Sequence, residues 1–108
     1  MGSRLADTAF VDVMVTLWDE ESASETLALA HQLRREGLRV EIYPEFDKLG
    51  KQFKYASSRG VPFVALIGPE ERARHETALK DLRSGEQQTL RREAVAATLR
   101  EKLNSVQR

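Results

Sequence analysis

Cysteine is absent from this sequence of 108 residues, and its absence excludes several kinds of chemistry. Without cysteine the chain has no disulfide bond, no thiolate nucleophile and no zinc-finger site. A chain without disulfides also fits a reducing compartment, so we expect a cytoplasmic protein.

An excess of charge of either sign is absent as well. The 17 Lys and Arg residues balance the 17 Asp and Glu residues, which gives a formal net charge of +0. This balance disfavours a protein that coats nucleic acid through bulk charge. It leaves room for a local basic patch, because binding depends on where the charges lie.

Long hydrophobic runs are also lacking. No run of about 18 apolar residues is present, so the sequence predicts no membrane span and no membrane partner. The N-terminus lacks the basic and then apolar pattern of a secretory signal. We expect residues 1–10 to be a leader or linker and residues 11–108 to form one domain, which is the usual number for this length.

The apolar pattern predicts strands and helices in alternation. Ser22 and Glu25 form an S-x-x-E capping box that predicts a helix start, and Gly37 predicts the end of that helix. We expect strands over 11–17, 39–43, 63–67, 77–82 and 87–90, and further helices over 48–59, over 69–74 and along the stripe formed by Val95, Leu99, Leu103 and Val106.

The element order is therefore β-α-β-α-β-(short α)-β-β-α. Alternating β and α units favour parallel strands joined by right-handed crossovers, whereas the hairpin adds an antiparallel part. The sequence thus predicts an α/β fold with a mixed five-stranded sheet flanked by helices on both faces.

Motifs for nucleotide chemistry are not found. The glycine-rich fingerprint is missing after the first strand, where Asp19, Glu20 and Glu21 would repel a pyrophosphate. The Walker phosphate loop and the nucleophile elbow are missing too. We interpret the acidic cluster as favourable charge at a helix N-terminus, and Trp18 as a packing residue rather than a stacking platform.

The two histidines suggest no metal site. His31 and His75 lie far apart, and no spacing of other ligands joins them. We therefore expect no metal, no cofactor and no catalytic residue in this chain.

The expected helix over 48–59 offers the strongest pattern for binding. At about 100° per residue, Leu49, Phe53 and Ala56 fall on its inner face. The opposite face carries Lys51, Lys54, Tyr55 and Ser58. Cations can contact phosphates and an aromatic ring can stack on an unpaired base, although an exposed helix face is usually only solvated.

Three segments match motifs of one known family. Residues 49–56 (LGKQFKYA) resemble a helix of the histidyl-tRNA synthetases, and residues 60–64 (GVPFV) resemble the entry to one of their strands. Residues 79–87 (LKDLRSGEQ) are similar to their K-D-L-x-[ST]-G-E-Q hairpin. The resemblance extends over nearly all of the stretch from Val11 to Leu103, and it points to the C-terminal anticodon-binding domain of these class II synthetases.

The resemblance implies a domain that recognises the anticodon loop of the histidine tRNA, tRNA(His). The catalytic domain of the parent synthetase, itself expected to be a homodimer, would carry the ligase reaction together with ATP and Mg²⁺. This chain alone is expected to be non-catalytic.

The resemblance also implies the contact residues. Lys54, Glu71 and Lys80 match places where related domains meet anticodon bases, with Lys51 nearby on the helix. The two matched lysines donate to bases or phosphates or are solvated surface charges, and Glu71 accepts from a base or stabilises a helix start. Phe46 or Tyr55 is expected to stack on a base.

Two alternatives belong to other functional classes. One is a non-catalytic, synthetase-like module that binds tRNA in a regulatory role. The other is a small enzyme of flavodoxin-like shape, which the missing phosphate loop disfavours.

Overall fold

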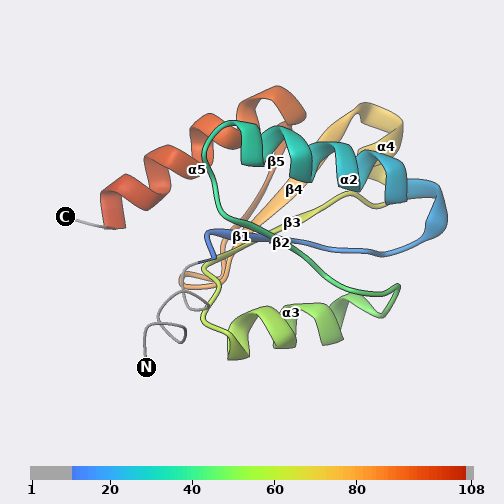
Figure 1. Ribbon diagram of the computed structural model, residues 1–108, viewed down its shortest axis with the longest axis horizontal. Coiled ribbons are helices and arrows are strands. Elements are labelled where there is room, and N and C mark those ends of the chain that lie inside the picture. The colour runs from blue at the N-terminus through green and yellow to red at the C-terminus, as the bar shows by residue number, and fades with distance from the viewer. Residues whose placement is uncertain (1–10, 107–108) are drawn as a thin grey trace.

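The computed structural model describes residues 11–106, which form one mixed sheet of five strands with helices on both faces (Figure 1). The strand order in the sheet is β2-β1-β3-β4-β5. This arrangement confirms the fold class expected from the sequence. In chain order the elements are β1 (Val13–Val15), α2 (Glu20–Arg35), β2 (Val40–Ile42), α3 (Leu49–Ser58), β3 (Phe63–Leu66), α4 (Pro69–Arg74), β4 (Glu76–Asp81), β5 (Gln87–Arg91) and α5 (Arg92–Val106).

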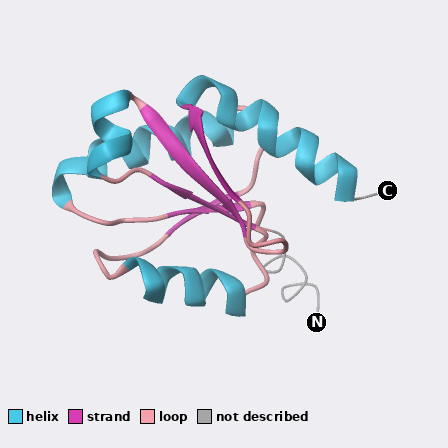
Figure 2. Cartoon of the chain, turned by 180° about the vertical axis from the view of Figure 1, so that it is seen from behind, coloured by secondary structure: helices cyan, strands magenta, loops and turns pink. Residues whose placement is uncertain are grey.

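The central strand β1 pairs in parallel with β2 on one side and with β3 on the other. Strands β4 and β5 then continue the sheet in antiparallel pairs. Helices α2 and α5 lie on one face of the sheet and α3 lies on the opposite face (Figure 2). From β1 the chain first moves across the sheet to β2, and it then returns past β1 to β3 on the other side. The strand order therefore switches between β1 and β3. In α/β sheets the carboxyl ends of two such neighbouring strands frame a binding crevice.

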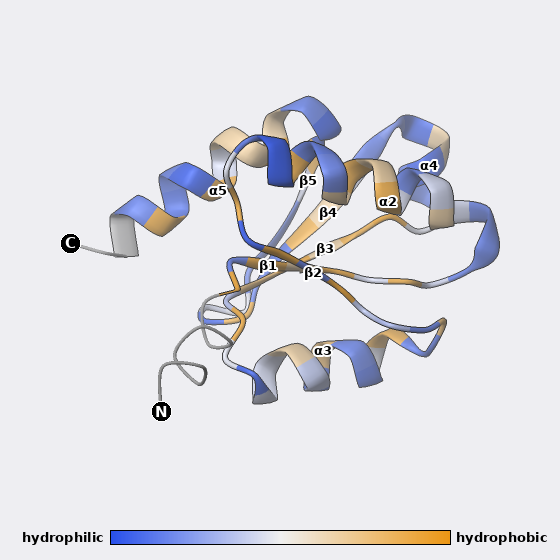
Figure 3. Ribbon diagram, in the orientation of Figure 1, coloured by the Kyte–Doolittle hydropathy of each residue, from blue (hydrophilic) through white to orange (hydrophobic). Residues whose placement is uncertain are grey.

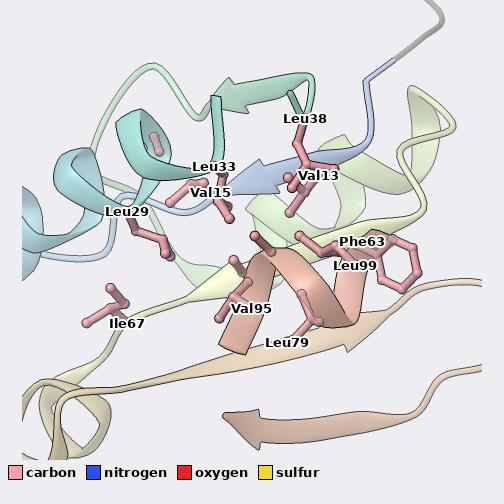
Figure 4. Packing of buried hydrophobic residues seen from close by; sticks show 13 residues of the cluster. Val13, Val15, Leu29, Leu33, Leu38, Phe63, Ile67, Leu79, Val95 and Leu99 are labelled. Atoms are coloured by element: carbon pink, nitrogen blue, oxygen red, sulfur yellow. The ribbon is translucent and has the colours of Figure 1, made fainter. Parts of the chain in front are cut away.

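Two buried clusters hold the layers together. The larger cluster packs β1, β3 and β4 against α2 and α5, with Val13, Val15, Phe63 and Leu99 among its members (Figure 4). The smaller cluster places Met14 and Val64 against Ala56 of α3. Alternate residues of a strand point to opposite faces, so β1 supplies both clusters.

The start of α2 differs from the sequence prediction. The N-cap is Asp19, whose carboxylate accepts a hydrogen bond from the Ser22 backbone N–H at 2.8 Å. The predicted start at Ser22 is therefore wrong, because aspartate caps a helix as well as serine does and stands three residues earlier. Further along α2, Leu27 is 41% exposed and its neighbour Thr26 is buried, so Leu27 faces solvent rather than the core.

The remaining boundaries follow the prediction closely. Helix α4 has the predicted bounds, and α3 is shorter than predicted by one residue at each end. Strands β1 and β2 are shorter than predicted, although extended chain beyond them keeps some bonds, such as that from the Tyr43 N–H to the Val15 carbonyl at 3.0 Å. The predicted helix end at Gly37 is confirmed by its φ of 92°.

The larger cluster yields a stability prediction. Phe63 is fully buried, so Phe63→Ala is expected to lower the free energy of unfolding by about 3–5 kcal/mol. The exposed control Leu27→Ala is expected to change it by less than about 0.5 kcal/mol. Chemical denaturation measures both values, and equal losses in the two variants would contradict the described core.

Candidate nucleic-acid interface

Helix α3 is fixed to the sheet by one buried amide. Gln52 is fully buried, and its Nε2 donates to the carbonyl oxygens of Leu17 and Asp47, each at 2.9 Å. Its Oε1 accepts from the Leu17 N–H, also at 2.9 Å. One side chain therefore joins α3 to the loops that follow β1 and β2. Sequence reasoning missed this role, although a glutamine on the apolar face of the predicted helix was a visible signal.

The loop before α3 is ordered around Asp47. Its carboxylate accepts from the Lys48 backbone N–H at 2.8 Å and forms an ion pair with Lys51, with 3.4 Å between Asp47 Oδ2 and Lys51 Nζ. These contacts, the Lys48 bond foremost, lower the pKa of Asp47 below its ordinary value. Lys51 is exposed as predicted, but Asp47 balances part of its charge.

Tyr55 is held against the sheet and does not lie on the exposed face of α3, so its predicted position is wrong. Its hydroxyl donates to Glu41 Oε2 at 3.0 Å and accepts from Arg59 Nη1 at 2.7 Å. Its ring meets that of Tyr43 edge to face, with 5.3 Å between centroids. Burial raises the pKa of Tyr43, and nearby Asp47 raises it further. The tyrosine pair anchors α3 beside β2.

Lys54 of α3 and Lys80 of β4 lie in different surroundings. Lys80 is half-buried, and its Nζ lies 5.5 Å from the centroid of the Phe53 ring. Lys54 is exposed. Because it stands two residues, or about 200°, from the buried Gln52, it faces away from the sheet. Phe53 is only half-buried, so it does not share the full burial expected of the inner face.

Strands β4 and β5 present a polar surface beside α3. Lys80 lies on this side of the sheet because it contacts Phe53, and residues paired directly across antiparallel strands share a face. The pairs on this face are Lys80 with Gln87, Ala78 with Thr89 and Glu76 with Arg91. The three partners from β5 are exposed, and we call them, together with Lys80, the β4–β5 polar face: Lys80, Gln87, Thr89 and Arg91. Figure 3 shows hydrophobic colour along the central strands, whereas α2 carries both hydrophilic and hydrophobic colour.

The carboxyl ends of the parallel strands carry the other predicted residues. Glu71 is half-buried in α4, and its Oε1 accepts from the Gly68 N–H at 2.9 Å. It therefore stabilises the start of α4, which is one of the two roles that the sequence predicted for Glu71. Phe46 is 47% exposed in the loop after β2. Trp18 follows β1, packs against Gly68 and still has 40% of its surface exposed.

The K-D-L-R-S-G-E-Q hairpin is stabilised within itself. Asp81 Oδ1 accepts from Arg83 Nε at 3.0 Å and from the Arg83 backbone N–H at 2.9 Å, and these bonds, the side-chain bond foremost, lower the pKa of Asp81. The Arg83 guanidinium lies 4.6 Å from the centroid of the Phe63 ring. A hollow of about 460 Å³ beside this hairpin is lined by Phe63, Leu79 and Lys102 among others, and Lys80 is not among its lining residues.

Residues 11–106 contain neither a metal-binding cluster nor a membrane-spanning helix. No group of three or more histidine, cysteine or carboxylate side chains could hold a metal ion there. Within the same residues, no helix is long and apolar enough to cross a membrane.

Comparison with known proteins assigns this arrangement to a family. Residues 10–102 match the family model described as "Anticodon binding domain". The RNA-binding domain of threonyl-tRNA synthetase from Cryptosporidium parvum Iowa II has the same fold, with a TM-score of 0.78 at 14% identity over 84% of this chain and 23% of that one. The chain therefore belongs to the anticodon-binding domain family.

Within that class the similarity is to histidyl enzymes. Histidine–tRNA ligase from Xylella fastidiosa (strain M23) is 44% identical over 86% of this chain, and that from Porphyromonas gingivalis is 46% identical over 76%. The histidyl-tRNA synthetase of Nostoc sp. PCC 7120 superimposes with a TM-score of 0.84 at 33% identity, over 94% of this chain and 26% of that one. The chain spans about a fifth of the length of the curated relatives it matches.

The buried amide yields a second prediction. Gln52→Leu leaves the Leu17 N–H and the Asp47 carbonyl without their partner, so it is expected to cost roughly 1–3 kcal/mol for each of these two groups. The Leu17 carbonyl keeps its bond from the Asp47 N–H. Gln88→Leu is the matched control, because Gln88 is exposed on β5. Denaturant unfolding of both variants gives the comparison, and a Gln52→Leu protein as stable as the control would refute the role of the amide.

Proposed function

We propose that this chain recognises the anticodon loop of tRNA(His) as a domain of a histidine–tRNA ligase. Its membership of the anticodon-binding family and its similarity to histidine–tRNA ligases support the proposal. The single observation that carries it is the β4–β5 polar face, which offers hydrogen-bonding groups and two cations beside α3. Unpaired bases have free edges, so a few such groups suffice to read them without a large positive field.

The proposed contacts differ in kind. Lys80 is positioned beside Phe53 to donate to a base or phosphate, whereas Lys54 faces solvent and is suited to a phosphate. Glu71 uses Oε1 at the start of α4, and the rest of its carboxylate is proposed to accept from a base. Phe46 is proposed to stack on a base, and Lys51 to add charge that Asp47 partly balances. Tyr55 is assigned to anchoring α3, because its hydroxyl is already bonded to Glu41.

The remainder of the ligase is proposed to supply the chemistry. ATP and Mg²⁺ would act in the catalytic domain of a homodimeric parent enzyme in the cytoplasm. No group of three or more metal-binding side chains among the described residues of this chain is placed to hold a metal ion.

Binding to anticodon stem-loops tests the proposal. The chain is expected to bind a stem-loop with the histidine anticodon more tightly than one with those three bases changed. Each well-read base is worth about 1–3 kcal/mol if discrimination resembles that in DNA. Titrations belong at low salt and at several salt concentrations, because phosphate contacts depend strongly on salt.

Lysine variants locate the contact. Lys80→Ala is expected to weaken binding, and if Lys80 meets only phosphate the salt slope falls by about 1 with no change in discrimination. Arg35→Ala is the control, since Arg35 is an exposed cation on α2, which covers the other face of the sheet. Equal affinity for matched and changed anticodons, both in this chain and in the whole ligase, would defeat the proposal and favour a module that binds tRNA without reading this anticodon.

A further inference from the structure

Trp18 occupies the point where the fold places a binding crevice. It follows β1, and it packs against Gly68, which follows the neighbouring parallel strand β3. A Cβ atom added to Gly68 would overlap the six-membered ring of Trp18, so only glycine allows this contact. The ring therefore packs on the Gly68 backbone, yet 40% of Trp18 is exposed. An aromatic ring that packs through one part and exposes another is suited to stacking.

The Gln52 amide also sets the backbone beside this ring. Gln52 holds Leu17, which precedes Trp18, and Asp47, which follows Phe46. The Asp47 N–H further donates to the Leu17 carbonyl at 3.4 Å. The two exposed aromatic residues at this edge are thus attached to neighbouring backbone segments that one buried side chain fixes.

The charges at this edge favour the base of a nucleotide over its phosphate group. Carboxylates at the ends of the parallel strands include Asp19, Glu45 and Glu70, and they repel phosphate groups. The same carboxylates accept hydrogen bonds from the N–H groups on a base edge. A base can therefore approach the Trp18 ring while its phosphates lie toward the lysines of α3 and β4.

We infer that Trp18 is a stacking platform for one unpaired base of the bound RNA loop. This inference rests on the proposed function, and it adds to it a contact at the crevice between β1 and β3, apart from the β4–β5 polar face. It also revises the interpretation of Trp18 as a packing residue: the ring packs on Gly68 and still leaves a surface exposed for stacking.

Intrinsic fluorescence tests the inference directly. Trp18 is the only tryptophan in the sequence, so tryptophan emission reports on this ring alone. Titration with the histidine anticodon stem-loop is expected to quench that emission. The midpoint of the quenching curve is expected to equal the midpoint measured independently from the anisotropy of the labelled RNA. Leu27→Ala, which alters another exposed hydrophobic residue on α2, is expected to leave both signals unchanged.

Substitutions separate stacking from folding. Trp18→Ala is expected to weaken stem-loop binding about 5- to 150-fold, which is the range for removing one base–aromatic stack. Trp18→Phe keeps an aromatic face and is expected to restore most of that loss. Gly68→Ala displaces the ring without removing it, so it is expected to weaken binding and to shift the emission of the free protein. Circular dichroism of each variant verifies that it is folded.

The outcomes distinguish the inference from the proposed function. Binding of the stem-loop without quenching, with Trp18→Ala as tight as the wild type, would overturn the platform and leave the proposed function standing. Failure of the wild-type chain to bind any stem-loop at low salt would count against the proposed function itself, and the platform would fall with it.

Discussion

The buried amide of Gln52 is the interaction on which the candidate interface depends. Its three hydrogen bonds join α3 to the loops after β1 and β2, and they add to the single backbone bond from the Asp47 N–H to the Leu17 carbonyl. A buried polar group costs free energy unless it is paired, so an amide with its oxygen and its nitrogen both bonded fixes one register of the helix. That register sets Tyr55 toward Glu41, Phe53 toward Lys80 and Lys54 toward solvent.

Two surfaces of opposite character follow from this arrangement. The carboxyl ends of the parallel strands carry carboxylates and exposed aromatic rings, whereas the β4–β5 polar face carries amide, hydroxyl and cationic groups. An RNA loop presents bases and phosphates separately, and the proposed contacts match that division: bases would meet rings and hydrogen-bonding groups, and phosphates would meet lysines. A domain with a formal net charge of +0 can therefore contact RNA through the positions of its charged and polar groups rather than through an excess of positive charge.

The sequence predicted the order and type of the elements because the apolar periodicities are strong and Gly37 and Gly60 end their helices with positive φ. It misplaced the start of α2, since Asp19 and Ser22 are both competent caps and the helix begins at the earlier one, whose carboxylate accepts from the Ser22 N–H. The site was harder to predict. Exposure of Lys54 follows from helical spacing, but the position of Tyr55 depends on Glu41, which is distant in sequence, as well as on Arg59, which follows one turn later on the same face. Contacts of this kind, like the seat of Trp18 on Gly68, arise only when strands become neighbours.

We propose that RNA binds on the α3 side of the sheet and at the carboxyl ends of its parallel strands. Mapping of backbone amide chemical shifts by NMR, during addition of the histidine anticodon stem-loop, tests this binding surface most directly. The changes are expected to concentrate in α3, in β4 and β5, and in the loops that contain Trp18, Phe46 and Gly68. Changes confined to the outer surfaces of α2 and α5, on the opposite face of the sheet, would contradict it.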